Sequence, residues 1–331
     1  MMLWLIFLSL MAVIFFTGKR LVKYGDMIAE KLNIGRTTAG VVFVASITSL
    51  PELITGISSV TYADTPDIAA GDIFGSCMFN LLILAFLDAF FRDKPITTKV
   101  HHGLTLSTAF GIIMITIAGM GILLGDFIPS VGWVSYTSLL IILVYFIAVK
   151  IVTDYERKLI ARSVRKVAEE LLYEKISLKD ILIRYLTNAT VLVLAAVFLP
   201  KVGKMISHEY GLTETFFGTL FIALTTSLPE FAVSAAAIKL NMITISVANI
   251  LGSNIFNIFI LAVDDIFYTK GSIFADVSHL NMTAAFSAVL MSSAVIIGLI
   301  YRAERKPLRL AFESIALVVI YIVAISILYL E

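Results

Sequence analysis

The sequence predicts an all-α polytopic membrane protein with ten transmembrane helices, arranged as two inverted five-helix repeats with broken helices at the centre. Hydrophobic residues make up 59% of the 331 residues and charged residues only 15%. Soluble domains carry about a quarter charged residues, so lipid is the expected solvent. Apolar stretches of membrane-spanning length occur along the whole chain. Two polar motifs also appear once in each half of the sequence.

The expected spans follow one another with short breaks. The first apolar run begins at Met2 and continues as an amphipathic helix through Lys31. Nine further spans lie at approximately 37–63, 67–91, 102–124, 131–152, 181–200, 214–239, 242–268, 278–300 and 308–330. Glycine, proline and aspartate separate most of them. Between 153 and 179, apolar residues at helical spacing predict a short surface helix. We therefore divide the chain into a first repeat (1–152), a cytoplasmic linker (153–180) and a second repeat (181–331).

The placement of basic residues predicts the orientation in the membrane. Twenty lysines and arginines fall in one set of alternating connecting segments, whereas the other set holds only Lys201, Lys204 and Lys270. Cytoplasmic loops carry the excess of positive charge. Both termini are therefore expected outside the cytoplasm, which an even number of spans satisfies, in the plasma membrane of a prokaryote-like cell.

The most specific feature is an internal repeat of two motifs. The sequence TSLPE occurs at 48–52 and again at 226–230. Downstream, GSCMFN at 75–80 is matched by GSNIFN at 252–257. Because five spans make up each repeat, the second copy enters the membrane in the opposite sense. Inverted repeats of this kind are typical of secondary transporters, whose substrate sites lie near the midplane.

Each motif has the composition of a site for a hard cation. Pro51 and Pro229 lack an amide hydrogen, so the carbonyls of Ile47 and Thr225 lose their helical partners. A glutamate in the middle of a membrane is costly and is functional by default. Clustered oxygen ligands of this kind suit Ca²⁺. The candidate carboxylate, hydroxyl and amide ligands are Glu52, Glu230, Thr48, Thr226, Ser49, Ser227, Ser76, Ser253, Asn80 and Asn257.

Other classes of function fit the sequence less well. A net charge of +1 gives no basic field for nucleic acid. Cys77 is the single cysteine, which excludes a cysteine-rich metal site. An intramembrane hydrolase could use two carboxylates as acid and base, but it would not require ligands mirrored in both halves. A channel would more typically be built from rings of symmetric subunits.

These residues resemble the two α-repeats of the cation/Ca²⁺ exchanger superfamily, and in particular the prokaryotic sodium/calcium exchangers. The resemblance implies a ten-helix antiporter without a prosthetic group, which exchanges Ca²⁺ for Na⁺ by alternating access. It also implies that Glu52 and Glu230 are shared Ca²⁺ and Na⁺ ligands. Backbone carbonyls of Thr48 and Thr226 would contribute, as would those of Ala45 and Ala223 at flanking Na⁺ positions. The serines and asparagines of the motifs would complete the shell.

Two departures from the family pattern bear on coupling. Ile47 and Thr225 stand where the family often has glycine, and Asn257 stands where some members have aspartate. With asparagine at both 80 and 257, two motif carboxylates balance one Ca²⁺, two Na⁺ or two protons, so a proton-coupled Ca²⁺ antiporter stays open. Asp72 replaces the amide of Asn249 in the repeat and either lines an ion path or caps a broken helix. Asp88 and Asp265, near span ends, are expected to cap or to shape the field at the cytoplasmic mouth.

Overall fold

The computed structural model describes residues 1–31, 47–91, 94–163, 177–306 and 310–331. The helices of the first half are α1 (Met2–Lys31), α3 (Leu50–Ser58), η1 (Ser59–Ala63), α4 (Pro66–Asp88), η2 (Ile96–Lys99), α5 (Leu104–Leu123), η3 (Gly125–Phe127) and α6 (Tyr136–Ser163). Those of the second half are α7 (Leu178–Tyr210), α8 (Glu214–Phe217), η4 (Gly218–Ile222), α9 (Ala223–Lys239), α10 (Ile243–Phe267), α11 (Ile273–Asp276), α12 (Asn281–Tyr301) and α13 (Phe312–Leu330). A two-residue hairpin, β1 (Ser130–Val131) with β2 (Val134–Ser135), precedes α6.

Nine helices of the described chain are long and apolar enough to cross a membrane. The expected span at 37–63 lies partly outside the described residues, and its described part is the end that contains α3 and η1. Because lipid cannot hydrogen-bond a free backbone, helices of this length are the expected way to cross it. The chain is therefore a multi-pass α-helical membrane protein.

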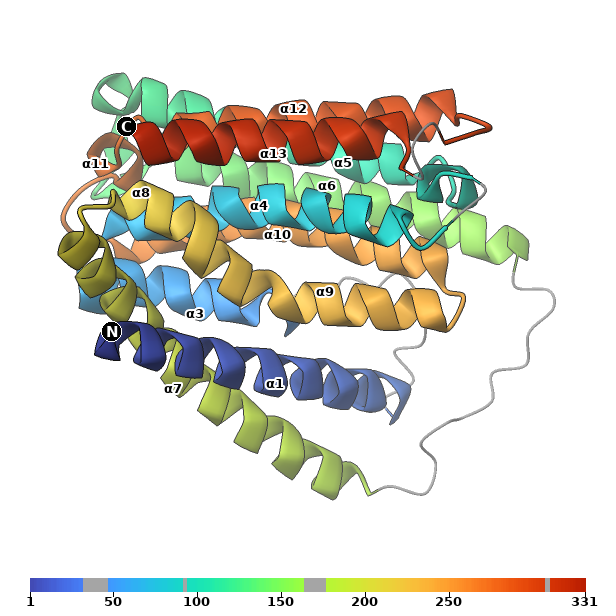
Figure 1. The fold of residues 1–331 in the computed structure, drawn as a ribbon, viewed down its shortest axis with the longest axis horizontal. Helices are drawn as coiled ribbons and strands as arrows, with labels where there is room; N and C mark the ends of the chain where they lie inside the picture. The colour runs from blue at the N-terminus through green and yellow to red at the C-terminus, as the bar shows by residue number, and fades with distance from the viewer. Residues whose placement is uncertain (32–46, 92–93, 164–176, 307–309) are drawn as a thin grey trace.

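The two halves run in opposite directions through the bundle (Figure 1). Helix α4 and its counterpart α10 lie side by side and are antiparallel, and α1 and α7 form a second antiparallel pair on the outside. Helices α5 and α12 are also neighbours and antiparallel. Corresponding helices of the two halves thus run in opposite directions, which is the arrangement of inverted repeats. Both termini lie at the same end of the bundle, which we call the terminus end.

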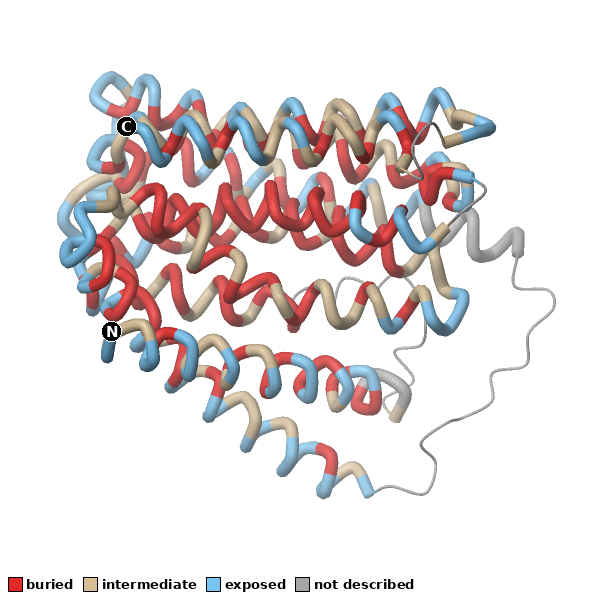
Figure 2. Tube along the Cα trace, viewed as in Figure 1, coloured by how far each residue is buried: buried red, intermediate tan, exposed pale blue. Residues whose placement is uncertain are grey.

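The centre of the bundle is formed by α4 and α10 (Figure 2). Nearly every residue of α4 is buried, and most of α10 is buried as well. The polar residues of these helices, among them Asp72, Ser76 and Asn80 of α4, are buried inside the bundle. By contrast, α1, α6, α7 and α13 expose a large apolar face, as expected for helices in contact with lipid.

The linker differs from the expectation. Helix α6 does not end at 152 but continues to Ser163, so the first part of the expected surface helix is an extension of α6. The remaining part, 164–176, lies outside the described residues. Hydropathy falls where charged residues begin, but helical hydrogen bonding does not need an apolar sequence and continues beyond the membrane edge.

Two buried aspartates join one repeat to the other. Asp265, near the end of α10, accepts hydrogen bonds from Ser135 N at 2.8 Å and from Ser138 Oγ at 2.5 Å, at the start of α6. It also accepts from the amide of Ile273 at 2.7 Å. An aspartate of the second repeat therefore caps the last helix of the first repeat.

Asp88 makes the matching joint at the other end of the bundle. It accepts hydrogen bonds from Ala311 N at 2.9 Å and from Ser314 Oγ at 3.1 Å, at the start of α13, and from Ile96 N at 2.8 Å. Lys306 adds a buried ion pair at 2.7 Å. The capping interpretation of both aspartates is thus the one the geometry supports.

Candidate cation-binding site

The structure brings the motif residues of both repeats together at the centre of the bundle. Eleven of the twelve expected residues are described and are essentially fully buried, and Ala45 lies outside the described residues. They are Thr48, Ser49, Glu52, Ser76, Asn80, Ala223, Thr226, Ser227, Glu230, Ser253 and Asn257. They come from the start of α3, from α4, from α9 and from α10.

Each glutamate is held by a serine of the other repeat. Ser49 Oγ donates to Glu230 Oε1 at 3.2 Å. Ser227 Oγ donates to Glu52 Oε1 at 3.1 Å. These two hydrogen bonds are related by the inverted repeat, so each carboxyl group contacts the TSLPE motif of the other repeat.

The threonines and the serines of the second motif form a further matched set. Thr48 Oγ1 lies 3.4 Å from Ser253 Oγ, and Thr226 Oγ1 lies 3.3 Å from Ser76 Oγ. Ser227 Oγ also lies 2.9 Å from Ser76 Oγ. Hydroxyl groups that donate and accept in one chain can reorient, which lets them present lone pairs to a cation.

The backbone near the two prolines is irregular in different ways. In the first repeat, α3 begins at Leu50 with Pro51 in its first turn, and Ser49 is not helical. In the second repeat, α9 runs through Pro229, and the irregular turn is the π-helical η4 that precedes it. Single π turns inside α-helices occur frequently at functional sites.

The amide side chains of the second motif behave differently from each other. Asn80 Nδ2 donates to Asn254 Oδ1 at 3.0 Å, and Asn254 Nδ2 donates to the carbonyl of Cys77 at 3.1 Å. Asn257 has no hydrogen-bond partner for either polar atom among the described residues. Asn254 was not predicted as a site residue. The signal in the sequence is that it aligns with Cys77 when the two motifs are compared, so a polar residue stands where the first repeat has a cysteine.

Several buried oxygens at the centre lack a partner. Glu52 Oε2, Glu230 Oε2, Asn80 Oδ1 and Asn257 Oδ1 accept no hydrogen bond from the described residues. The four ion pairs of the described chain all lie elsewhere. Buried polar atoms are normally satisfied, so unpartnered carboxylate and amide oxygens fit a site that accepts a hard cation as substrate.

Asp72 joins the site directly. Its Oδ1 accepts hydrogen bonds from Thr226 Oγ1 at 2.9 Å and from Ser76 Oγ at 3.3 Å. Because it is fully buried within α4, Asp72 does not cap a helix end. The structure therefore favours the interpretation that Asp72 lines the ion path.

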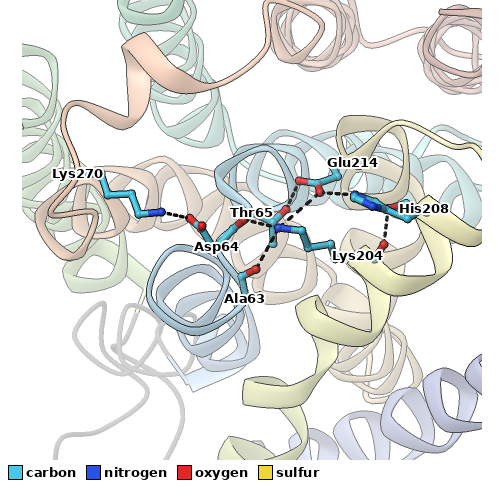
Figure 3. Close-up of polar contacts among 8 residues, drawn as sticks. Ala63, Asp64, Thr65, Lys204, His208, Glu214 and Lys270 are labelled. Carbon is cyan, nitrogen blue, oxygen red and sulfur yellow. Dashed lines mark hydrogen bonds and ion pairs between the residues drawn. The ribbon is translucent and has the colours of Figure 1, made fainter.

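A polar rim lies at the terminus end of the bundle (Figure 3). Lys270 pairs with Asp64 Oδ1 at 2.6 Å, and Lys204 donates to the carbonyl of Asp64 at 2.6 Å. The hydrogen bond from Lys270 holds the pKa of the Asp64 carboxyl below its ordinary value. Glu214 contacts both Lys204 and His208. The rim links the η1–α4 connection of the first repeat to α7, α8 and the end of α10.

The fold and the site together define an ion transporter of the inverted-repeat type. The family model described as "Sodium/calcium exchanger protein" matches residues 2–153 and 182–330. The chain therefore belongs to the sodium/calcium exchanger family, and it is a transporter rather than an enzyme.

Individual relatives agree with this membership. The inner membrane protein YrbG of Escherichia coli is 25% identical over 92% of this chain and 90% of its own length. The sodium/calcium exchanger MaX1 of Methanosarcina acetivorans is 28% identical over 46% of this chain and 41% of its own length.

Two solved exchangers share the fold. The sodium-calcium exchanger NCX_Mj has a TM-score of 0.62 at 22% identity, and the likeness covers 98% of each chain. The H⁺/Ca²⁺ exchanger CAX has a TM-score of 0.72 at 12% identity, and the likeness covers 99% of this chain and 86% of that one.

Proposed function

We propose that this protein is a Ca²⁺/Na⁺ antiporter of the plasma membrane, in which Glu52 and Glu230 bind the two ions in competition. The observation that carries the proposal is the pair of hydrogen bonds from Ser49 to Glu230 and from Ser227 to Glu52. Each glutamate keeps one carboxylate oxygen without a partner among the described residues. Two such oxygens, one from each carboxylate, are suited to a divalent cation.

Charge balance supports coupling between the two ions. Two carboxylates neutralise one Ca²⁺ or two Na⁺, and a site of low dielectric strongly disfavours uncompensated charge. A Ca²⁺ ion and two Na⁺ ions therefore compete for the charges of Glu52 and Glu230. Asp72 adds a third carboxyl that contacts Thr226 and Ser76, so a third Na⁺ also has a balancing charge.

The remaining ligands follow the repeat. Thr48, Thr226, Ala45 and Ala223 provide backbone carbonyls, while Ser76, Ser253, Asn80 and Asn257 provide side-chain oxygens. The chain spans the membrane with both termini outside the cytoplasm, and the linker 153–180 between the repeats faces the cytoplasm. This orientation rests on the excess of basic residues at the end opposite to the termini.

A proton-coupled Ca²⁺ antiporter is the second candidate. It is favoured by the absence of a carboxylate at 80 and 257, since two glutamates can exchange two protons for one Ca²⁺ without Na⁺. The two candidates differ in their driving gradient, and a flux measurement under each gradient separates them.

Glutamine at either glutamate tests the assignment of the site. Glu52→Gln and Glu230→Gln keep the size of the side chain and remove its charge, so each is expected to abolish exchange while the protein stays folded. The measurement is ⁴⁵Ca²⁺ uptake into proteoliposomes, with gel filtration in detergent as the control for folding. Ca²⁺ flux that persists in either variant would contradict the assignment.

A further inference from the structure

A buried aspartate outside the central site has no partner in the described part of the chain. Asp264 lies in α10, seven residues after Asn257, and is fully buried. Neither of its carboxylate oxygens accepts a hydrogen bond from the described residues. Leaving a carboxyl group buried and unsatisfied is costly, so its retention calls for a ligand.

The carboxyl group of Asp264 occupies space that a glycine leaves open. It packs against Gly56 of α3, where an added Cβ would lie 2.6 Å from Oδ1 and 2.7 Å from Cγ. Gly56 is one helical turn beyond Glu52 toward the terminus end. Thr55 beside it is fully buried, and its hydroxyl also has no partner among the described residues.

Asp72 connects this aspartate to the central site. Asp72 Oδ1 is bonded to Thr226 and Ser76, while its Oδ2 has no partner among the described residues. Asp264 lies in α10 and Asp72 in α4, two helices that pack against each other, and both residues are fully buried. The carboxyl groups therefore form a series that leads from Glu52 toward the terminus end.

The other half of the molecule lacks this series. By the register of the repeat, Asn249 replaces Asp72, Leu87 replaces Asp264 and Ser234 replaces Gly56. Asn249 Nδ2 donates to Ser234 Oγ at 3.5 Å, and the side chains at all three positions are uncharged. The two sides of the central site therefore differ in charge, because the additional carboxyl groups of Asp72 and Asp264 lie on the terminus side.

We propose that Asp264 and Asp72 form an outer position for a hard cation, Na⁺ or Ca²⁺, between the central site and the terminus end. The ion occupies it on the way to or from Glu52 and Glu230. This inference rests on the proposed transport of cations through the central site. It makes cation affinity higher on the terminus side than on the opposite side.

Equilibrium binding of ⁴⁵Ca²⁺ to the full-length protein in detergent tests the outer position without requiring transport. A Glu52→Gln/Glu230→Gln variant is expected to keep a weak Ca²⁺ binding. Adding Asp264→Asn, which preserves the shape of the side chain, is expected to weaken this residual binding about tenfold. Adding Asp126→Asn, an exposed aspartate at the same end, serves as the matched control and is expected to leave it unchanged. Equal residual binding with and without Asp264→Asn would overturn the proposal.

Flux measurements on each face of the membrane give a second test. In oriented proteoliposomes, Asp264→Asn alone is expected to raise the KM for Ca²⁺ about tenfold on the terminus side and to leave the opposite side unchanged. A purely structural role would change the KM on both sides equally, or on neither, and either result would overturn the proposal. If the wild type binds Ca²⁺ at the outer position but exchanges no ion, the proposed function fails and the outer position stands.

Discussion

At the scale of single residues, the central site is shared between the repeats rather than duplicated. The carboxyl of Glu52 is oriented by Ser227 of the second repeat, and that of Glu230 by Ser49 of the first. Any movement of one repeat against the other therefore changes the surroundings of both glutamates. In the proposed antiporter, this contact would couple ion binding to the alternation of access.

Ser49→Ala and Ser227→Ala are expected to weaken Ca²⁺ affinity by similar amounts. Each removes one hydrogen bond to a carboxylate, worth about 1 kcal/mol, or roughly fivefold in affinity. Ca²⁺ titration of the purified variants measures the effect, with Ser326→Ala, an exposed serine in α13, as the control. A large effect for one serine and none for the other would contradict the symmetric geometry.

Asp88→Asn is expected to destabilise the protein more than Asp265→Asn. Both changes weaken a cap between the repeats, but only Asp88→Asn leaves the buried Lys306 ammonium without its ion-pair partner. Breaking a buried pair costs about 3–5 kcal/mol, against about 1–3 kcal/mol for an unsatisfied hydrogen bond.

Thermal unfolding in detergent measures this difference between the two aspartates. The double variant Asp88→Asn/Lys306→Met is expected to recover part of the loss, because it removes the stranded charge. A larger loss of stability for Asp265→Asn, or no recovery in the double variant, would show that the ion pair does not stabilise the joint.

The sequence predicts which residues form the candidate site better than it predicts which of them contact one another. Glu52, Glu230 and the repeated hydroxyls follow from the repeat alone, since polar groups are costly in a membrane. The hydrogen bond from Ser49 of the first repeat to Glu230 of the second depends on how the two antiparallel repeats pack together. No local sequence pattern encodes this packing. Asp264 also escaped prediction, because only the structure shows that Asp265 accepts hydrogen bonds and that Asp264 accepts none from the described residues.

At the scale of helices, small residues determine how closely the central elements approach. Helix α4 crosses η4 at Gly75, where an added Cβ would lie 2.6 Å from the Cα of Thr219. One turn earlier, a Cβ at Gly71 would lie 2.9 Å from the carbonyl oxygen of Thr215. Glycines at this spacing permit backbone contact between helices in a membrane.

Gly75→Ala and Gly111→Ala are expected to have opposite effects on stability. At Gly75 the added methyl group meets backbone atoms, and overpacking of this kind costs about 1–3 kcal/mol. At Gly111 in α5 nothing lies within 4 Å of the added atom, so alanine is expected to stabilise by about 0.5–1 kcal/mol. Thermal unfolding of the two variants in the same detergent measures their melting temperatures. Equal melting temperatures would contradict the close crossing of α4 and η4.

Helix boundaries show where sequence patterns fail. The apolar pattern places the end of the first repeat at 152, whereas α6 continues to Ser163. Proline predicts a break at both motifs, but α9 is continuous through Pro229 and the irregular turn lies in η4. A lost backbone hydrogen bond is local, while neighbouring helices determine where the backbone accommodates it.

At the scale of the whole molecule, one helix contacts the site-bearing elements of both repeats. Gly18 of α1 packs against Pro229, and Gly25 packs against Ile47, so α1 lies beside the TSLPE motif of each repeat. Its partner α7 is antiparallel to it on the outside of the bundle (Figure 1). The caps at Asp88 and Asp265 lie on α4 and α10 and not on this outer pair.

The overall charge of the central site is expected to set the number of monovalent ions exchanged. Asn257→Asp adds a carboxyl where the described residues leave both polar atoms of the amide without a partner. The added charge is expected to raise cation affinity or to increase the number of monovalent ions exchanged for each Ca²⁺. Reversal-potential measurements in proteoliposomes give this number. An unchanged potential and an unchanged affinity would show that position 257 does not contribute to the site.

Uptake of ⁴⁵Ca²⁺ into proteoliposomes, under an outward Na⁺ gradient and separately under an outward proton gradient, tests the central claim most directly. Exchange at Glu52 and Glu230 predicts uptake driven by the Na⁺ gradient alone and lost in Glu52→Gln. Uptake driven only by the proton gradient would contradict Na⁺ coupling and support the proton-coupled Ca²⁺ antiporter instead. Uptake under neither gradient would contradict the account of this protein as a Ca²⁺ antiporter.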